Sequence, residues 1–417
     1  MTSELARRIA FTLGALLVYR FGAYIPLPGT DAAAWGQATG YHSRDILFGV
    51  VDMPAAGTAR HAAIFALGIG PYITAAVLIQ IVSIAWSRLR NLSAAGERGR
   101  SKILLYTLLL TLVLAVFQAF AVAQALERVH GLVPQPGLMF ELTTTVTLAA
   151  GTLTLIWLSN QITLRGFGNG LALVLAVGLV VDFPPVIAAA AQRVHLGILT
   201  SDKMVLTIVL AVFITGVMVL FEGARRAIPL NFSERTVGGA TIPSRAANLM
   251  LKVNGGGLIP AIVVGWVIAI VAVGVMLGFD AGVAIVPALA PGHLPFMILF
   301  CILLMPAALI YAAFLIDPDT ASETLVRFGG TVKGIAPGEA TAGYLDSVLS
   351  RLTFLGTIYL AFVFIVPQLL IVYLGVPFYL GGIAFLILVC VTLDMSTQIR
   401  QEMQFENLKL NVGGYRR

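Results

Sequence analysis

The side chains that most often carry chemistry are few in this 417-residue chain, and they form no catalytic pattern. Its five histidines and two cysteines are spread along the chain without the spacing of a zinc motif. No phosphate-binding G-x-x-x-x-G-K occurs, and the glycines around Asn169 indicate a turn and cap between two helices. We therefore expect no enzyme activity, no metal site and no cofactor.

Ionisable residues inside a membrane would indicate ion-coupled transport, because each costs at least about 2.5 kcal/mol at the bilayer centre. The apolar segments of this chain hold almost none. Arg20, Asp182 and Asp394 lie near segment ends, where the interface can solvate them. The sequence therefore lacks the ionisable residues that proton or sodium coupling would need. A channel gated by apolar side chains is still compatible with it.

The elements that must position any such conduit are long apolar segments. Hydrophobic residues make up 59% of the chain, charged residues only 11%, and the mean hydropathy is +0.94. We expect an all-α polytopic membrane protein, since helices satisfy their own backbone polar groups in lipid. The ten apolar segments are 9–25, 62–85, 103–125, 143–163, 170–191, 204–221, 258–278, 295–316, 352–373 and 378–397.

Positive charge gives the orientation. Twenty of the 26 lysines and arginines fall on one side of the ten segments, which places both termini in the cytoplasm. Arg7 and Arg8 before the first segment leave a cleaved signal peptide as an alternative, although that segment is long for one. The charge needs no DNA partner to explain it, but the basic loops could meet an acidic partner such as ribosomal RNA.

The second segment differs from a simple anchor. Residues 64–85 read IFALGIGPYITAAVLIQIVSIA, a run of membrane length that carries Gly68, Gly70 and Pro71 in its outer half. Glycine and proline break the outer end of the helix and leave its apolar body intact. This pattern favours a helix that lines a passage.

Six blocks, in order, resemble the SecY family, whose members form the channel of the bacterial Sec protein translocase. The resemblance covers essentially the full length and includes polar loop motifs. The blocks are IFALGIGPYI, GERGRSKILLYT, TLVLAVFQ, ITLRGFGNG, LKVNGGGLIPAI and TAGYLDSVLSRLT.

The resemblance implies two five-helix halves of inverted topology, residues 1–203 and 204–417, that close like a clamshell around a pore. It also implies a plug before the second span and a collar of bulky aliphatic side chains. The plug maps onto Pro54, Ala55, Ala56, Gly57, Thr58, Ala59, Arg60, His61, Ala62 and Ala63. The collar maps onto Ile69, Ile73, Leu175, Ile262 and Ile387.

A lateral gate between spans 2–3 and 7–8 is implied as well, with polar positions at Thr74 and Gln118. In span 7, Gly265 and Trp266 replace the small hydroxyl residues usual in the family. Without the resemblance, each collar residue would be interpreted as ordinary helix packing. For Thr74 and Gln118 the alternative is a structural hydrogen bond between helices that has no role in gating.

Two cytoplasmic loops, 222–257 and 317–351, correspond to the family's docking sites for the SecA motor or the ribosome. In the second loop, Ala336 stands where the family carries an arginine important for docking. The docking residues implied are Arg225, Arg226, Arg235, Arg245, Lys252 and Ala336.

The resemblance therefore implies a channel in the inner membrane that conducts unfolded preproteins and releases hydrophobic segments and signal sequences sideways into lipid. SecE and SecG are the implied partner subunits. Three alternatives remain: a specialised paralogous translocase with another motor or other clients, a solute permease built on inverted repeats, and a degenerate scaffold subunit that does not conduct.

Overall fold

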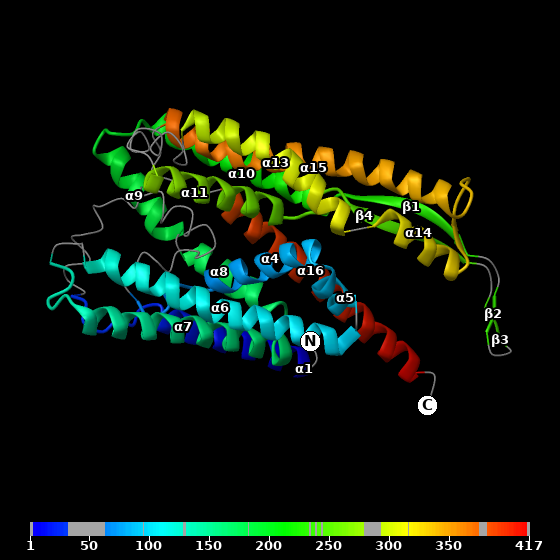
Figure 1. The fold of residues 1–417 in the computed structure, drawn as a ribbon, viewed down its shortest axis with the longest axis horizontal. Helices are drawn as coiled ribbons and strands as arrows, with labels where there is room; N and C mark the ends of the chain where they lie inside the picture. Colours follow the sequence, from blue (N-terminus) through cyan, green and yellow to red (C-terminus); the bar gives the residue numbers. More distant parts are fainter. Residues whose placement is uncertain are drawn as a thin grey trace. The chain divides into compact units, whose positions relative to one another are not determined.

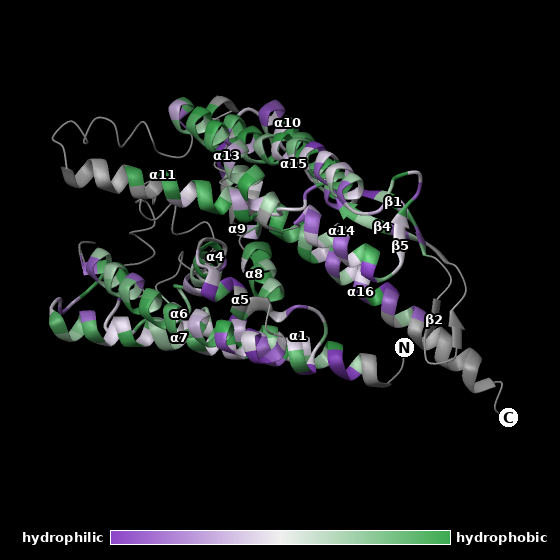
Figure 2. Cartoon of the chain, turned by 45° about the vertical axis from the view of Figure 1, so that its right-hand side comes forward, coloured by the Kyte–Doolittle hydropathy of each residue, from purple (hydrophilic) through white to green (hydrophobic). Residues whose placement is uncertain are grey.

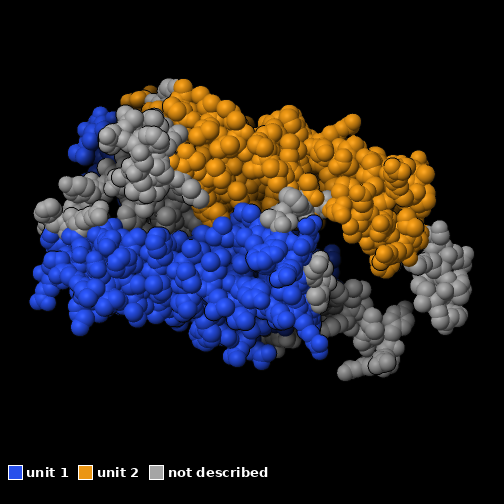
Figure 3. All heavy atoms as spheres, viewed as in Figure 1, with its two compact units in different colours: residues 1–198, 390–417 blue, residues 199–389 orange. Residues whose placement is uncertain are grey.

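The computed structural model describes most of the chain (Figure 1). Its described residues are 3–31, 63–94, 96–127, 131–181, 183–232, 235–237, 240–242, 245–278, 293–315, 317–374 and 382–414. They group into two compact units, Met1–Ile198 with Cys390–Arg417, and Leu199–Val389 (Figure 3). Each unit is described by itself below.

In the part of unit 1 that the structure describes, the named elements are all helices. They are α1 (Ser3–Gly22), α4 (Gly70–Ala85), α5 (Ser87–Ala94), α6 (Gly96–Glu127), α7 (Leu138–Arg165), α8 (Gly170–Val181), α9 (Phe183–His195) and the later part of α16 (Gly382–Gly414). The chain packs α6 against both α4 and α7, and α1 against α7. The buried face of α6 carries Thr107, Thr111, Ala115, Ala119 and Ala123, a small residue at every fourth position, which lets the neighbouring helices approach closely.

Unit 2 combines helices with a small sheet. Its helices are α10 (Ser201–Gly223), α11 (Ile259–Gly278), α13 (Leu294–Leu315), α14 (Pro318–Arg327), α15 (Glu339–Leu374) and the start of α16. The helix α15 packs against α10, α13 and α14. Between α13 and α15, the rings of Phe300 and Phe364 stack with centroids 3.7 Å apart, and Phe296 lies about 6 Å from both.

The strands correct the expectation of an all-α chain. In the loop expected at 222–257, β1 (Arg225–Phe232) pairs antiparallel with β4 (Arg245–Lys252), and β2 (Arg235–Val237) pairs with β3 (Ala240–Ile242). In the loop expected at 317–351, β5 (Gly330–Val332) joins the other edge of β1. The sheet order is β4-β1-β5.

The sheet is held by a core that also includes α15. Ile228, Leu230 and Val332 from the strands are almost fully buried with Leu345 and Val348 from α15. Because α15 begins at Glu339, its first turns pack into this core, and the helix starts within the range 317–351 that was expected to be a loop.

Hydrophobic residues make up much of the long helices, as is typical of a membrane protein (Figure 2). Phe117, Val212 and Leu220 expose between 68% and 72% of their side chains, which would be costly in water but suits contact with lipid. Among the described residues, five apolar stretches are long enough to cross a membrane, in α6, α7, α10, α13 and α15. The full count of ten spans stays a prediction.

Two predicted segments have a different local structure. Residues 63–69 form turns, and α4 begins only at Gly70, with Pro71 in its first turn. The expected span 170–191 consists of two helices, because α8 ends at Val181 and α9 begins at Phe183. Asp182 lies outside the described residues.

Candidate functional site

The start of α4 is the best-defined part of the candidate pore. Ala63 pairs with Pro26 in an isolated β-bridge, and the backbone N–H of Ile64 donates to the carbonyl of Ile25 over 3.0 Å. Gly68 has φ of 57°, a left-handed conformation that strongly favours glycine. This segment therefore begins with a specific, hydrogen-bonded turn, as the glycine and proline pattern indicated.

Ile69 and Ile73 sit immediately after that turn. Ile69 is the N-cap residue of α4, with φ −95° and ψ 1°, and it is only 2% exposed. The N–H of Ile73 donates to the carbonyl of Ile69 over 3.2 Å, which places the two side chains one helical turn apart on one face. Ile73 is half-buried.

The other three collar positions lie on three different helices. Leu175 is half-buried in α8 of unit 1. Ile262 in α11 and Ile387 in α16 belong to unit 2 and are half-buried as well. Partial burial suits a residue that faces a narrow space, but the convergence of all five on one pore stays a prediction.

Both gate residues belong to a packed pair of helices in unit 1. Thr74 in α4 donates its hydroxyl to the carbonyl of Gly70 over 3.0 Å, so its proton is used within its own helix. Gln118 is half-buried in α6, which packs against α4. Thr74 can therefore still accept a hydrogen bond across a seam but not donate one without breaking this bond.

The plug positions are mostly outside the described residues. Of the ten predicted, only Ala63 is described, 1% exposed and paired with Pro26; residues 54–62 are not. The plug stays a prediction.

The docking residues lie on the three-stranded sheet, on the separate β2–β3 pair and in a turn after β5. Arg225 stands opposite Lys252 in the β1–β4 register, and Arg225, Arg226 and Lys252 are all exposed. Arg235 lies in β2 and Arg245 at the first position of β4. Ala336 is exposed in the turn between β5 and α15, where its carbonyl accepts a hydrogen bond from the Thr341 hydroxyl.

One junction of unit 2 was not anticipated from the sequence. Asn254, between β4 and α11, is 6% exposed, and its Nδ2 donates to Oε1 of Glu222 at the end of α10 over 2.7 Å. The sequence signal that could have indicated this contact is a polar residue next to three glycines, because an amide that becomes buried needs a hydrogen-bond partner.

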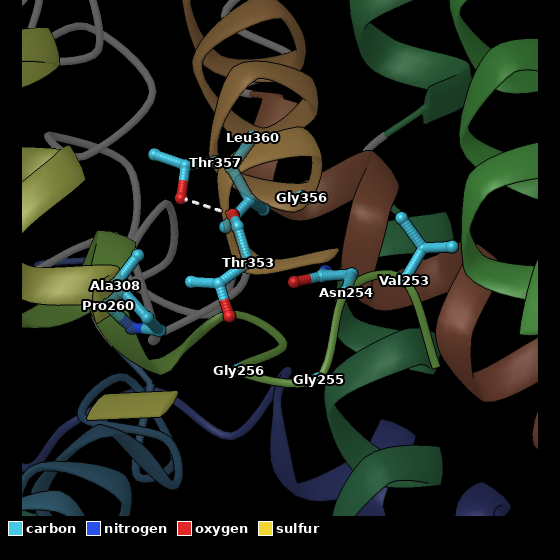
Figure 4. A pocket seen from close by; sticks show the side chains of 10 residues that line it. All are labelled: Val253, Asn254, Gly255, Gly256, Pro260, Ala308, Thr353, Gly356, Thr357 and Leu360. Atoms are coloured by element: carbon cyan, nitrogen blue, oxygen red, sulfur yellow. Dashed lines mark hydrogen bonds between the residues drawn. The ribbon is translucent and has the colours of Figure 1, made fainter. Parts of the chain in front are cut away.

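A small recess lies beside this junction (Figure 4). It is formed by the glycine turn, Pro260, Ala308 and the face of α15 around Gly356. The hydroxyl of Thr357 points to the Thr353 carbonyl, 2.7 Å away, and so is bonded within α15. The cavity volume is about 10 Å³, enough for about one water molecule, so it is not a ligand site.

The described residues contain no group of three or more His, Cys, Asp or Glu side chains that could hold a metal ion. One acidic group has a specific environment. The Thr320 hydroxyl, 2.6 Å away, and the Asp319 backbone N–H lower the pKa of Asp317, the N-cap residue of α14. This carboxylate has a structural role, as a cap.

Comparison with known proteins decides the family. A sequence model of the SecY family matches residues 63–396. The chain belongs to the SecY family. It is 36% identical to the protein translocase subunit SecY of Escherichia coli K12, over 99% of this chain and 96% of that protein. It is 35% identical to the SecY of Vibrio cholerae, over all of this chain and 96% of the relative.

Solved structures share the SecY fold. A protein-conducting channel matches with a TM-score of 0.68 and 18% identity, over 97% of this chain and 94% of that one. Sec61 in the canine ribosome-channel complex of the endoplasmic reticulum matches with a TM-score of 0.62 and 17% identity, also over 97% and 94%. The resemblance found in the six sequence blocks is thus confirmed, and the solute permease is set aside.

Proposed function

We propose that this chain is the central pore-forming subunit of a Sec-type translocase. It conducts unfolded preproteins across the cell inner membrane, and both of its termini lie in the cytoplasm. The collar consists of Ile69, Ile73, Leu175, Ile262 and Ile387.

The observation that carries the proposal is the pair Ile69 and Ile73 at the start of α4. Ile69 ends a hydrogen-bonded turn and Ile73 follows on the same helical face. Aliphatic side chains cannot coordinate ions, so a narrow collar of them loses its water and resists leakage. The same side chains have rotamer freedom and yield around an extended polypeptide.

Lateral release would use the seam beside α4 and α6. Gln118 and Thr74 are the polar groups that we assign to this seam, and a hydrogen bond across such a seam contributes about 1 kcal/mol. A contact of that size biases the seam toward closure without locking it. A hydrophobic signal sequence could then displace it and reach the membrane lipids.

The driving force would come from partners, because the sequence contains no nucleotide-binding motif. SecE would clamp the two halves and SecG would be an accessory subunit. SecA or a ribosome would dock on the cytoplasmic sheet, where Arg225, Arg226 and Lys252 are exposed. The 20 lysines and arginines on that side of the chain also suit contact with ribosomal RNA.

A second candidate is a specialised paralogous translocase with its own motor or clients. Ala336 favours it, because this exposed position offers a methyl group where the family pattern has an arginine. A motor that relies on that arginine would find no charged partner in this turn.

One reconstitution tests both candidates. The full chain is co-purified with SecE and SecG homologues, placed in liposomes and supplied with a preprotein, SecA and ATP. We expect protease-protected, full-length preprotein inside the liposomes. Import only with a different motor would favour the paralogue, and no import with any motor or ribosome would refute the channel function.

A further inference from the structure

The ring of Phe65 lies between α1 and α7, four residues before Ile69. It is 6% exposed and stacks on Tyr19 of α1, with ring centroids 6.3 Å apart and an interplanar angle of 20°. One turn further along α1, the ring covers the backbone at Gly22. A Cβ atom at Gly22 would overlap Cε2 of Phe65 and would lie 2.6 Å from Cδ2. The glycine is therefore what lets the ring dock on α1.

The opposite side of this turn meets α7 at another glycine. A Cβ atom at Gly151 would overlap the carbonyl oxygen of Ile64 and lie 3.3 Å from Cδ1 of Phe65. Two helices thus approach the same two residues, Ile64 and Phe65, through positions without a side chain. The three atoms nearest to a Cβ atom at Gly22 all belong to the Phe65 ring, whereas the two nearest at Gly151 are backbone atoms of Ile64.

Backbone hydrogen bonds connect the docked residues Ile64 and Phe65 to the start of α4. The N–H of Ala66 donates to the carbonyl of Ala63, and the N–H of Gly68 donates to the carbonyl of Phe65, over 3.0 and 2.9 Å. Ile69 then caps α4 without any side-chain capping bond. The first turn of α4 therefore depends on packing for its position, and the Phe65 ring is the large side chain of this turn docked on α1.

We propose that Phe65 is a positioning residue of the pore: its ring fixes the start of α4 on α1 and α7 and so sets where Ile69 and Ile73 stand. This inference rests on the proposed channel function for its consequence, a sealed resting pore. The packing itself is independent of that function, and the two can be measured separately.

The first test compares Phe65→Ala with Phe21→Ala in the full chain with its partner subunits. Phe21 is the neighbour of Gly22 on α1 but is 71% exposed, so it is a matched control of the same residue type. We expect Phe65→Ala to speed amide hydrogen exchange in residues 63–70 about tenfold or more, because these bonds open more often. We also expect a higher resting ion conductance in planar bilayers, and neither change in Phe21→Ala.

The second test is a double-mutant cycle. Gly22→Ala alone should also raise exchange and conductance, because its methyl group displaces the ring. In the double variant Gly22→Ala with Phe65→Ala, the methyl group enters the space the ring has left, so both measures should move back toward wild type. Gly151→Ala is the control, since its clash is with the Ile64 backbone and Phe65→Ala cannot relieve it.

The outcomes separate the inference from the function on which it rests. We call the docking of Phe65 on α1 and α7 the anchor. It is refuted if amide exchange in Phe65→Ala equals that in Phe21→Ala. It is also refuted if the effects of Gly22→Ala and Phe65→Ala on exchange simply add in the double variant. If the wild type imports preprotein but Phe65→Ala does not leak, the positioning role fails and the channel function stands. If the wild type imports nothing while the exchange cycle behaves as expected, the channel function fails and the anchor stands.

Discussion

The side-chain amide of Asn254 donates a 2.7 Å hydrogen bond to the carboxylate of Glu222 and thereby joins the end of α10 to the turn that leads into α11. Next to it, the N–H of Val253 donates to the carbonyl of Ala224, which closes the base of the β1–β4 pair. On the other side, a Cβ atom at Gly356 of α15 would come within 2.9 Å of the Val253 carbonyl. Three elements of unit 2 therefore meet at one short turn.

Loss of the Asn254 amide should destabilise this junction. Asn254→Leu would leave the half-buried Glu222 carboxylate without its hydrogen-bond donor. Loss of a hydrogen bond to a charged group lowers the free energy of unfolding by about 1.5 to 3 kcal/mol. We expect a lower thermal unfolding temperature in detergent. Glu222→Gln is the control, because its amide oxygen still accepts from Asn254; equal destabilisation by both variants would contradict this account.

The collar should control the resting leak. Glycine at Ile69, Ile73 and Ile262 removes the aliphatic groups that exclude water, so ion conductance without preprotein should rise. Glycine also weakens helices by about 1 kcal/mol each relative to alanine, so alanine variants of the same positions are measured in parallel. Planar-bilayer recording checks the result, and a conductance unchanged in both sets would remove these residues from the collar.

The exposed charges of the sheet should matter for partner binding. Changing Arg225 and Arg226 to glutamate should weaken binding of a motor or ribosome and reduce the salt dependence of that binding, because both side chains are exposed on β1. Lys203→Glu on the predicted outer side is the control. Binding to proteoliposomes at several salt concentrations is the measurement, and equal losses in both variants would argue against a cytoplasmic docking surface.

The N-cap of α14 should stabilise the protein less as the pH falls. The Thr320 hydroxyl holds the pKa of Asp317 below its ordinary value, so the charged carboxylate stabilises the folded state above the unfolded pKa. That contribution is lost as the pH falls through the lowered folded pKa. We expect wild type to be more stable than Asp317→Ala near neutral pH and this difference to shrink in acid. Thermal unfolding of both proteins across that pH range checks it; a constant difference would exclude the carboxylate charge as the cause.

The sequence by itself determined the helical framework and the class of protein. Long apolar runs must be helical in lipid, because every backbone polar group needs an internal partner there. Gly68, Gly70 and Pro71 marked the point where α4 begins, because their allowed backbone angles are local properties. The polar loop motifs indicated the SecY family, and the comparisons confirm it.

The tertiary structure alone decided the contacts between distant segments. The pairing of Arg225 with Lys252 and the bond from Asn254 to Glu222 join residues 27 and 32 positions apart, which no local pattern predicts. The docking of Phe65 on Gly22 is similar, since a phenylalanine in an apolar run has no local sign of its neighbour. The physical reason is that helix formation depends on the residues within one turn, whereas packing depends on which surfaces the fold brings together.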